Sequence, residues 1–346
     1  MLWSRVRIPP GSPSLGFSVI MNPFKKARWV AEIILVRLGL VTVPFFPRNL
    51  VLLLARLAGA AGYVLARNSR KIALTNLDLA FKESLSATEK RRIARQAFGT
   101  MARTVLDMIW FCRDTDRRLA RYLTLDPDFR NRIYTTPVIG LTAHFGNWEL
   151  LGRGLVALGY PHAAVAAPLI NPGVERLFHR SRMMSGMDII PKEGALRGVL
   201  KALKRKKHVA LVLDQNVRPE DGGIFVDFFG LPVPMSGAAA IFAVRTGTPI
   251  VLLFCLAQPN GTYQVYALPP LKPASFTGSD SSRQSSLAEP DNTRTITQTV
   301  AGLFEQEIRK HPGQWLWMYK RWKHIPPGLS PAAYPFYAKP IKTKET

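Results

Sequence analysis

Residues with catalytic chemistry stand close together at positions 144–149, in the stretch HFGNWE. His144 ends an apolar run, and Glu149 follows five residues later, in the first turn of a segment with helical character. A histidine can take a proton near neutral pH, and a carboxylate can hold one ring nitrogen while the other accepts that proton. The spacing therefore predicts a catalytic pair, with His144 as general base and Glu149 orienting it. A polar end to a buried strand is the competing interpretation.

The sequence lacks the motifs of several other enzyme classes. It contains no Gly-x4-Gly-Lys phosphate loop, no Gly-x-Ser-x-Gly nucleophile elbow, and no His-Glu-x-x-His or Cys-x-x-Cys metal site. The only two cysteines, Cys112 and Cys255, are far apart, which predicts two reduced buried thiols and no disulfide framework. We therefore expect no metal and no cofactor. A histidine base without a protein nucleophile implies that the attacking hydroxyl belongs to a substrate.

Alternating strands and helices surround this pair and must position it. The pattern predicts an α/β fold, with a mostly parallel sheet, flanking helices and an antiparallel edge made by a hairpin at Asn260-Gly261. His144 and Asp214, in VLDQN, each end a predicted strand at the same edge of that sheet. The predicted strands are 136–144, 162–168, 187–192, 208–216, 248–257 and 262–271, and the predicted helices are 85–113, 148–158, 172–185, 194–207, 236–247 and 293–311. Residues 275–292 are expected to form an exposed loop.

The amino-terminal part of the chain differs from the rest. Residues 1–20 show no periodicity and are predicted to be a non-native or disordered extension, with the true start at Met21. Residues 21–71 hold two apolar runs, each about the length of a bilayer span, flanked by basic clusters. Glu32, Arg37 and Arg56 interrupt these runs, so we predict one membrane anchor, either a spanning helix or a helix pair in the interface. A buried core hairpin is the alternative.

Charge narrows the class of partner. The net charge is +24 over 346 residues, and the mean hydropathy of +0.03 is high for a purely soluble protein. The excess favours an anionic partner, which could be a membrane surface, an acidic protein or nucleic acid. A basic protein that binds nucleic acid or membranes without catalysis is the non-enzymatic alternative. Its best feature is KALKRKK, which is equally a solvated helix face, and no nucleic-acid recognition motif is present. We therefore expect no nucleic-acid partner.

Several segments, in order, resemble one enzyme family. HFGNWE is similar to the His-x4-Asp/Glu signature of lysophospholipid acyltransferases, in the form used by the lipid A biosynthesis branch of lauroyl and myristoyl acyltransferases. NSRKIALTNLDLAF, the block from HRSRMMSGMDIIPK to VLDQN, GIFVDFFGLPVPMSGAAAIFAVRTGTPIV and the closing QWLWMYKRWK fit the same branch. The resemblance covers about residues 22–325. Tyr319 departs from it, because many members have a histidine there.

The resemblance implies a fold like that of glycerol-3-phosphate acyltransferase and a function in lipid A and lipopolysaccharide biosynthesis. It implies an acyltransferase domain at 72–325, a flexible tail at 326–346 and a cell inner membrane location with the catalytic domain on the cytoplasmic face. His144 and Glu149 would move an acyl group from a thioester, on acyl carrier protein rather than coenzyme A, to a hydroxyl of an anionic glycolipid. The acceptor would be a lipid A precursor, with phosphatidylinositol mannoside or another glycolipid as the alternative. The substrate-binding residues it implies are Arg182, Arg180, Asp214, Asn147 and Trp148.

Overall fold

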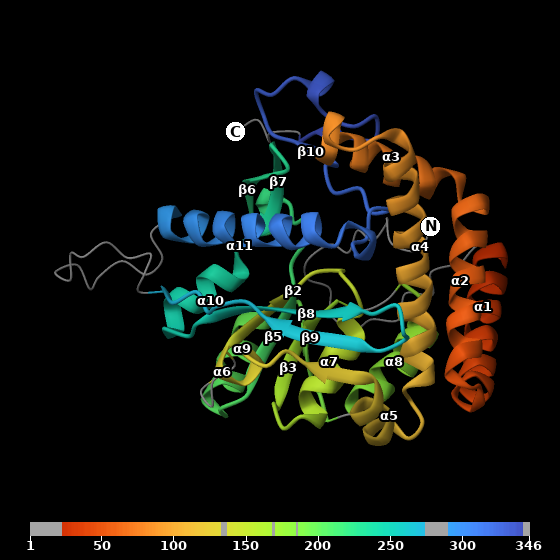
Figure 1. Ribbon diagram of the computed structural model, residues 1–346. Helices are drawn as coiled ribbons and strands as arrows, with labels where there is room; N and C mark the ends of the chain where they lie inside the picture. Colours follow the sequence, from red (N-terminus) through yellow and green to blue (C-terminus); the bar gives the residue numbers. More distant parts are fainter. Residues whose placement is uncertain (1–22, 133–136, 168–169, 185, 274–289, 342–346) are drawn as a thin grey trace.

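A computed structural model describes residues 23–132, 137–167, 170–184, 186–273 and 290–341 (Figure 1). The expected extension at 1–20 and nearly all of the expected loop at 275–292 lie outside these residues. The long helix α4, Ala87–Trp110, begins with a capping box, in which Ser86 and Glu89 bind each other's backbone N–H. The helices are α1 Pro23–Thr42, α2 Arg48–Leu65, α3 Arg67–Phe81, α4 Ala87–Trp110, α5 Thr115–Tyr122, α6 Phe129–Arg132, α7 Trp148–Ala157, α8 Pro172–Met184, α9 Ala195–Lys204, α10 Ala238–Thr246 and α11 Pro290–Lys310.

A seven-stranded mixed sheet forms the centre of the molecule, in the order β1-β9-β8-β2-β5-β3-β4. The five strands from β8 to β4 are parallel, and β9 returns antiparallel to β8, which confirms the predicted parallel sheet with an antiparallel edge. The strands of this sheet are β1 Leu123–Leu125, β2 Ile139–Thr142, β3 His162–Ala166, β4 Asp188–Pro191, β5 His208–Val212, β8 Ile250–Ala257 and β9 Tyr263–Ala267. Two small two-stranded sheets are added by β6 Gly223–Phe228 with β7 Leu231–Ser236, and by β10 His324–Ile325 with β11 Lys339–Pro340.

Both faces of the large sheet are covered, which the sequence of β8 already reflects. All residues of this strand up to Leu256 are buried, and alternate side chains enter two different hydrophobic cores. Ile250, Leu252 and Phe254 pack with α9, α10 and α11, whereas Val251 and Leu253 pack with α7 and the end of α4. A continuous apolar run of this kind is typical of a strand with helices on both sides.

The first helices form a separate layer on one side of the molecule, at the right of Figure 1. α2 packs closely along α4, because a Cβ atom at Gly59 would come within 2.6 Å of the Cα of Gly99. Among the described residues, α2 is the one helix long and apolar enough to cross a bilayer. Most of the large apolar side chains that the described residues expose lie on α1, α2 and the turn between them: Val30, Ile34, Leu35, Leu38, Val41, Phe45, Leu50, Leu53, Leu57, Val64 and Leu65.

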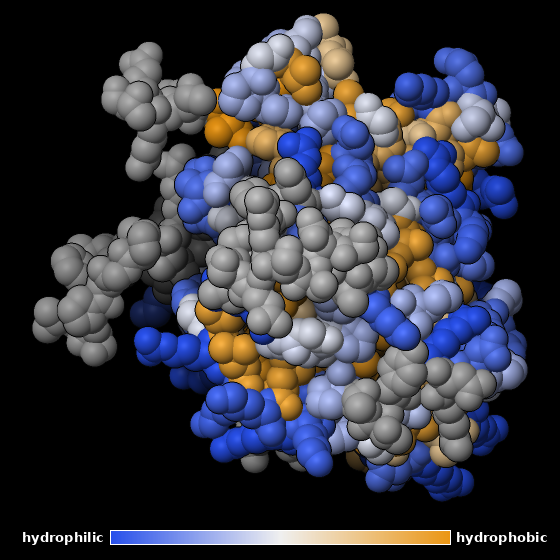
Figure 2. Space-filling model, turned by 90° about the vertical axis from the view of Figure 1, so that its left-hand side faces the viewer, coloured by the Kyte–Doolittle hydropathy of each residue, from blue (hydrophilic) through white to orange (hydrophobic). Residues whose placement is uncertain are grey.

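We call the exposed apolar side chains of α1, α2 and the turn between them the apolar stripe. On the opposite side of the molecule, the face seen in Figure 2 is largely hydrophilic where its atoms are coloured, and its apolar atoms lie in scattered groups. The exposed apolar surface is thus concentrated where the sequence predicted an anchor. The expected boundary at residue 71 is less sharp than predicted, since it falls inside α3, whose inner face packs into the main core.

The carboxyl-terminal tail is not a flexible appendage in its described part, residues 326–341, and this corrects the expectation for 326–346. β11 pairs with β10, and the Tyr334 hydroxyl donates to the carbonyl oxygen of Pro232 at 2.9 Å. The Tyr337 hydroxyl binds the side chain of buried Asn76 on α3. Two buried tyrosines hold this proline-rich segment against the domain.

Candidate active site

Two neighbouring parallel strands bring the proposed catalytic residues together. β2 and β5 pair with Thr142 opposite Val212, and the Leu213 N–H donates to the Thr142 carbonyl oxygen at 3.1 Å. His144 and Asp214 each stand two residues beyond this last pair, at the carboxyl edge of the sheet. Sequence analysis placed both residues at that edge, and the structure shows that their strands are adjacent.

The carboxylate of Asp214 holds the His144 ring. Asp214 Oδ1 lies 2.7 Å from His144 Nδ1, and Oδ2 accepts the backbone N–H of His144 at 3.0 Å. Because an ionised carboxylate can only accept hydrogen bonds, Nδ1 carries a ring proton, and in the neutral ring Nε2 is then the nitrogen with the lone pair. The carboxylate that lies on Nδ1 is thus Asp214, whereas the sequence analysis expected Glu149 to hold a ring nitrogen.

Asp214 is ionised in spite of its burial. Its side chain is 3% exposed, and burial alone would raise its pKa, but the adjacent His144 ring and hydrogen bonds from His144 and Trp315 lower the pKa of this carboxyl below its ordinary value. The indole Nε1 of Trp315 donates to Asp214 Oδ2 at 2.8 Å. With three donors on one carboxylate, its orientation is fixed and so is that of the histidine it holds.

A tight turn joins His144 to helix α7. Gly146 has a φ of +58°, and a Cβ atom there would lie 2.1 Å from the carbonyl oxygen of Cys255, so only glycine fits. Asn147 then caps α7 by accepting the Leu150 N–H at 2.9 Å. Asn147 is 1% exposed, so its side chain is buried within this turn. The ring of Trp148 packs 4.8 Å from that of His144, centre to centre.

The cap residue is itself held by a buried polar chain that reaches α2. Asn147 Nδ2 donates to the Tyr263 hydroxyl at 3.2 Å, and that hydroxyl binds Asp107 on α4. Nη1 and Nη2 of the Arg48 guanidinium both donate to the Asp107 carboxylate, and Nη2 also donates to the Gly261 carbonyl oxygen at 2.9 Å. Arg48 and Asp107 are 7% and 0% exposed, so this ion pair is shielded from water. The first residue of α2 is thereby connected to the turn that carries His144.

The remaining predicted site residues lie on two helices. Glu149 is part-buried in the first turn of α7, next to Trp148. Arg180 and Arg182 lie on α8, and their side chains are outside what the structure describes. α8 itself packs against α1, because a Cβ atom at Gly173 would lie 2.2 Å from Ile33. The helix with the two arginines thus borders the helix with the first half of the apolar stripe.

Sequence analysis missed the residues that support the site from the closing segment QWLWMYKRWK. Trp315 is not the only contact from this segment. The Leu316 N–H donates to the His144 carbonyl oxygen at 3.1 Å. The Gly146 N–H donates to the carbonyl oxygen of Gln314 at 2.9 Å. Tyr319, the residue that departs from the family pattern, accepts the Asn216 N–H at 3.1 Å. The cluster of tryptophans and arginines was visible in the sequence, but 170 residues separate it from His144 along the chain.

A second missed residue is Gln215, which follows Asp214. Its side-chain Nε2 lies 3.3 Å from His144 Nε2 and 3.5 Å from Nδ1.

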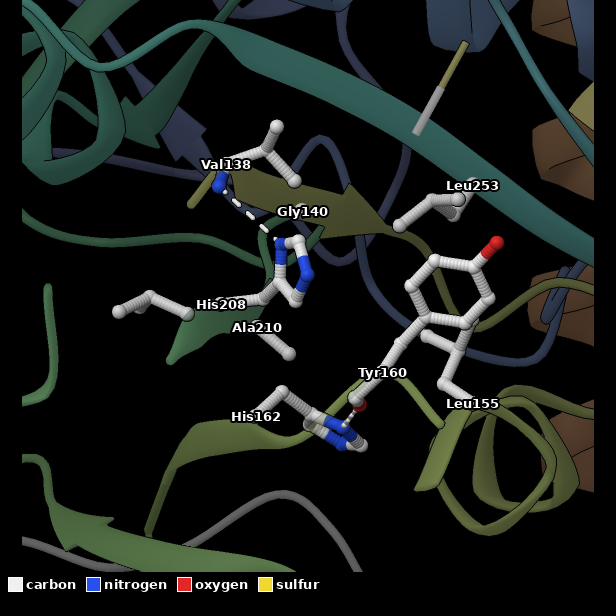
Figure 3. A pocket seen from close by; sticks show the side chains of 9 residues that line it. Val138, Gly140, Leu155, Tyr160, His162, His208, Ala210 and Leu253 are labelled. Atoms are coloured by element: carbon white, nitrogen blue, oxygen red, sulfur yellow. Dashed lines mark hydrogen bonds between the residues drawn. The ribbon is translucent and has the colours of Figure 1, made fainter. Parts of the chain in front are cut away.

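A small cavity of about 20 Å³ lies away from the His144 site. His162 and His208, the first residues of β3 and β5, line it at the amino edge of the sheet (Figure 3).

Comparison with known proteins identifies the family. Residues 21–324 match the model of the bacterial lipid A biosynthesis acyltransferases. The chain belongs to this family. It is 24% identical to the lipid A biosynthesis palmitoleoyltransferase of Escherichia coli over 279 residues, which are 79% of this chain and 84% of that protein. It is 25% identical to the lipid A biosynthesis lauroyltransferase of Escherichia coli over 285 residues, or 76% and 82% of the two chains.

A phosphatidylinositol mannoside acyltransferase of Mycobacterium tuberculosis is 28% identical over 184 residues, 52% of each chain. The chain is therefore an acyltransferase of the lipid A or glycolipid type. This agrees with the acyltransferase family and the glycolipid type of acceptor that the sequence analysis expected.

Proposed function

We propose that this acyltransferase moves a fatty acyl group from an acyl thioester, on acyl carrier protein, to a hydroxyl of a lipid A precursor at the cytoplasmic face of the cell inner membrane. The observation that carries the proposal is the His144–Asp214 pair, in which Nδ1 donates to a buried carboxylate and Nε2 holds the lone pair. That arrangement is suited to removing a proton from a substrate hydroxyl. Family membership supplies the reaction class.

The reaction proceeds in two steps without an acyl-enzyme. The acceptor oxygen attacks the thioester carbonyl carbon, its proton passes to His144 Nε2, and the carbonyl electron pair moves to the oxygen. Asp214 stabilises the imidazolium that forms. When the tetrahedral intermediate collapses, the carbon–sulfur bond breaks, the ester is complete, and the leaving sulfur takes the proton from His144 Nε2.

Glu149 and the arginines of α8 have separate roles in this proposal, Glu149 towards His144 and the arginines towards the acceptor. Glu149 adds negative charge beside the His144 turn and favours the imidazolium. The amino end of α7 adds the positive end of a helix dipole close to the developing oxyanion. Arg182, together with Arg180, binds a phosphate of the acceptor through its fork of N–H donors. The packing of α8 against α1 supports this role, because a lipid phosphate is found next to the membrane surface.

The acyl carrier protein is favoured over coenzyme A as donor because the chain carries a net charge of +24 and carrier proteins are acidic. A phosphatidylinositol mannoside acceptor is the second candidate, and the similarity to the mycobacterial acyltransferase favours it. Mass spectrometry of host lipids after deletion of the gene separates the two. Loss of one acyl mass from lipid A supports the first acceptor, and an unchanged lipid A profile contradicts it.

The membrane part of the proposal rests on the apolar stripe. α2 buries one side against α4 and exposes Leu53 and Leu57 at 49% and 58%. Because its first residue is held in a buried ion pair and its inner side is packed, we propose that α1 and α2 lie in the interface with the stripe in the acyl region, and do not cross the bilayer. Lys25, Lys26 and Arg67 would then meet anionic headgroups.

Membrane binding is tested with the double variant Leu53→Ser/Leu57→Ser on vesicles of anionic phospholipid. Both side chains are exposed, so their loss should leave the melting temperature unchanged and weaken vesicle binding. Leu329→Ser, at 44% exposure in the carboxyl-terminal segment, is the matched control and should bind normally. Undiminished binding by the double variant would show that the stripe does not contact lipid.

Catalysis is tested by transfer of a labelled acyl chain from acyl carrier protein to the lipid acceptor, with circular dichroism as a control for folding. His144→Gln cannot take the proton and should lose about 10²–10⁴ in rate. Glu149→Gln should also lose rate, and the double variant should be little worse than the worse single variant, since the two residues act as a unit. If His144→Gln keeps more than about a tenth of the rate, the loss is smaller than the penalty expected for a lost base, and the histidine is not the base.

A further inference from the structure

The mechanism above does not use Gln215, although its side chain lies beside the reactive nitrogen of His144. The amide Nε2 of Gln215 lies 3.3 Å from His144 Nε2. Gln215 is part-buried at the carboxyl end of β5, directly after Asp214. It therefore reaches the space in which a substrate hydroxyl must approach His144.

The backbone on both sides of Gln215 is fixed by the closing segment. Asp214 accepts the Trp315 indole N–H at 2.8 Å. Asn216 donates its backbone N–H to Tyr319 at 3.1 Å, and its side-chain oxygen accepts from Arg321 Nη1 at 2.6 Å. Arg321 is 1% exposed, and burial lowers its pKa to about 10. The backbone that carries Gln215 is thus held on both sides, which helps to fix the position of its amide as a preorganised donor requires.

The hydrogen-bond roles around the ring change during the reaction. Nδ1–H is committed to Asp214. Gln215 Nε2 lies 3.3 Å from His144 Nε2 and 3.5 Å from Nδ1, so the amide stands over the face of the ring and not in line with the Nε2 lone pair. When Nε2 takes the substrate proton, a negative oxygen appears on the carbon bonded to the oxygen that gave up that proton. An N–H donor a few ångströms from Nε2 is therefore placed to donate to this new acceptor.

We propose that the side-chain amide of Gln215 is a catalytic residue that donates to the oxyanion of the tetrahedral intermediate. This rests on the proposed function. In the first step, the C–O bond forms, the hydroxyl proton passes to His144 Nε2, and the carbonyl π pair becomes the oxyanion that Gln215 Nε2–H binds. In the second step, the oxyanion pair re-forms the carbonyl, the C–S bond breaks, and the thiolate takes the proton. Gln215 exchanges no proton in either step.

The test compares Gln215→Glu and Gln215→Ala with wild type in the acyl carrier protein transfer assay. Gln215→Glu keeps the shape but removes the N–H donors and adds negative charge next to the oxyanion. Loss of one oxyanion donor costs about 10²–10³ in kcat, and we expect Gln215→Glu to fall at or below this range with little change in KM. Gln298→Glu is the matched control, because Gln298 binds the backbone of Asp227 in β6, and it should transfer normally.

A pH profile separates an oxyanion donor from a residue that merely holds the ring. For a donor, Gln215→Ala lowers kcat at every pH and leaves the midpoint of the pH profile of kcat in place. If Gln215 only positions the ring, or if its oxygen faces Nε2, Gln215→Glu stabilises the imidazolium, moves that midpoint upward and keeps kcat within tenfold of wild type. That result overturns the proposal even when His144→Gln is inactive. A wild-type enzyme without thioester-dependent transfer instead contradicts the proposed function itself.

Discussion

Replacing Asp214 with asparagine tests the geometry of the site most directly, because the structure specifies how the new side chain must sit. Asp214 Oδ2 accepts two N–H groups, from the His144 backbone and from Trp315. An asparagine satisfies both only if its Oδ1 takes the place of Oδ2. Its amide nitrogen then occupies the position of Oδ1, 2.7 Å from His144 Nδ1, and points an N–H at the ring. Nδ1 must become the acceptor, so the ring proton moves to Nε2.

The consequence is loss of the base without loss of the fold. With Nε2 protonated, His144 cannot accept the substrate proton in its stable tautomer, and the carboxylate that favours the imidazolium is gone. The penalty for losing general-base catalysis is about 10²–10⁴ in rate, equivalent to about 2.7–5.4 kcal/mol of transition-state stabilisation. We expect Asp214→Asn to lose kcat in this range while KM changes little.

The assay is steady-state transfer of a labelled acyl chain, with thermal unfolding as the measure of stability. Asp188→Asn is a matched control, because Asp188 is an exposed partner of Lys207 at the start of β4, and its loss should leave kcat unchanged. A folded Asp214→Asn enzyme that keeps more than about a tenth of wild-type kcat would have lost less than the penalty for removing the base. That result would refute the assignment of the ring proton to Nδ1.

Further predictions concern the turn, the acceptor site and pH. Gly146→Ala forces a side chain into a left-handed backbone 2.1 Å from a carbonyl oxygen, so it should cost at least about 1–3 kcal/mol of stability and most of the activity, and a melting temperature equal to wild type would contradict this. Arg182→Ala should raise KM for the phosphorylated acceptor, and Arg182→Lys should recover only part of that loss; equal kinetics in all three enzymes would reject the phosphate contact. Burial lowers the pKa of His162 below 6.5, so its contribution to stability is present above pH 6.5 and is lost as the pH falls below that value, and His162→Gln should lose less melting temperature than wild type between pH 7 and pH 5.

The sequence by itself determined the class of the fold and the place in it of the histidine that we propose as the base. Strands with apolar runs and intervening helices specify a covered, mostly parallel sheet, because only burial on both faces accommodates a strand such as β8. The same pattern placed His144 and Asp214 at the carboxyl edge, and the Ser86 capping box fixed the start of α4. These features depend on residues close in the chain, which is why local pattern was sufficient to predict them.

The partner of the base was decided only by the tertiary structure. Glu149 is five residues from His144 in the sequence, whereas Asp214 is seventy residues away, and proximity along the chain favoured the wrong carboxylate for Nδ1. Strand order is not encoded locally, so nothing in either segment indicated that β2 and β5 are neighbours. The same holds for Trp315, Gln215 and the Arg48–Asp107 pair: each acquires its role from packing between segments brought together when the sheet and its covering helices assemble.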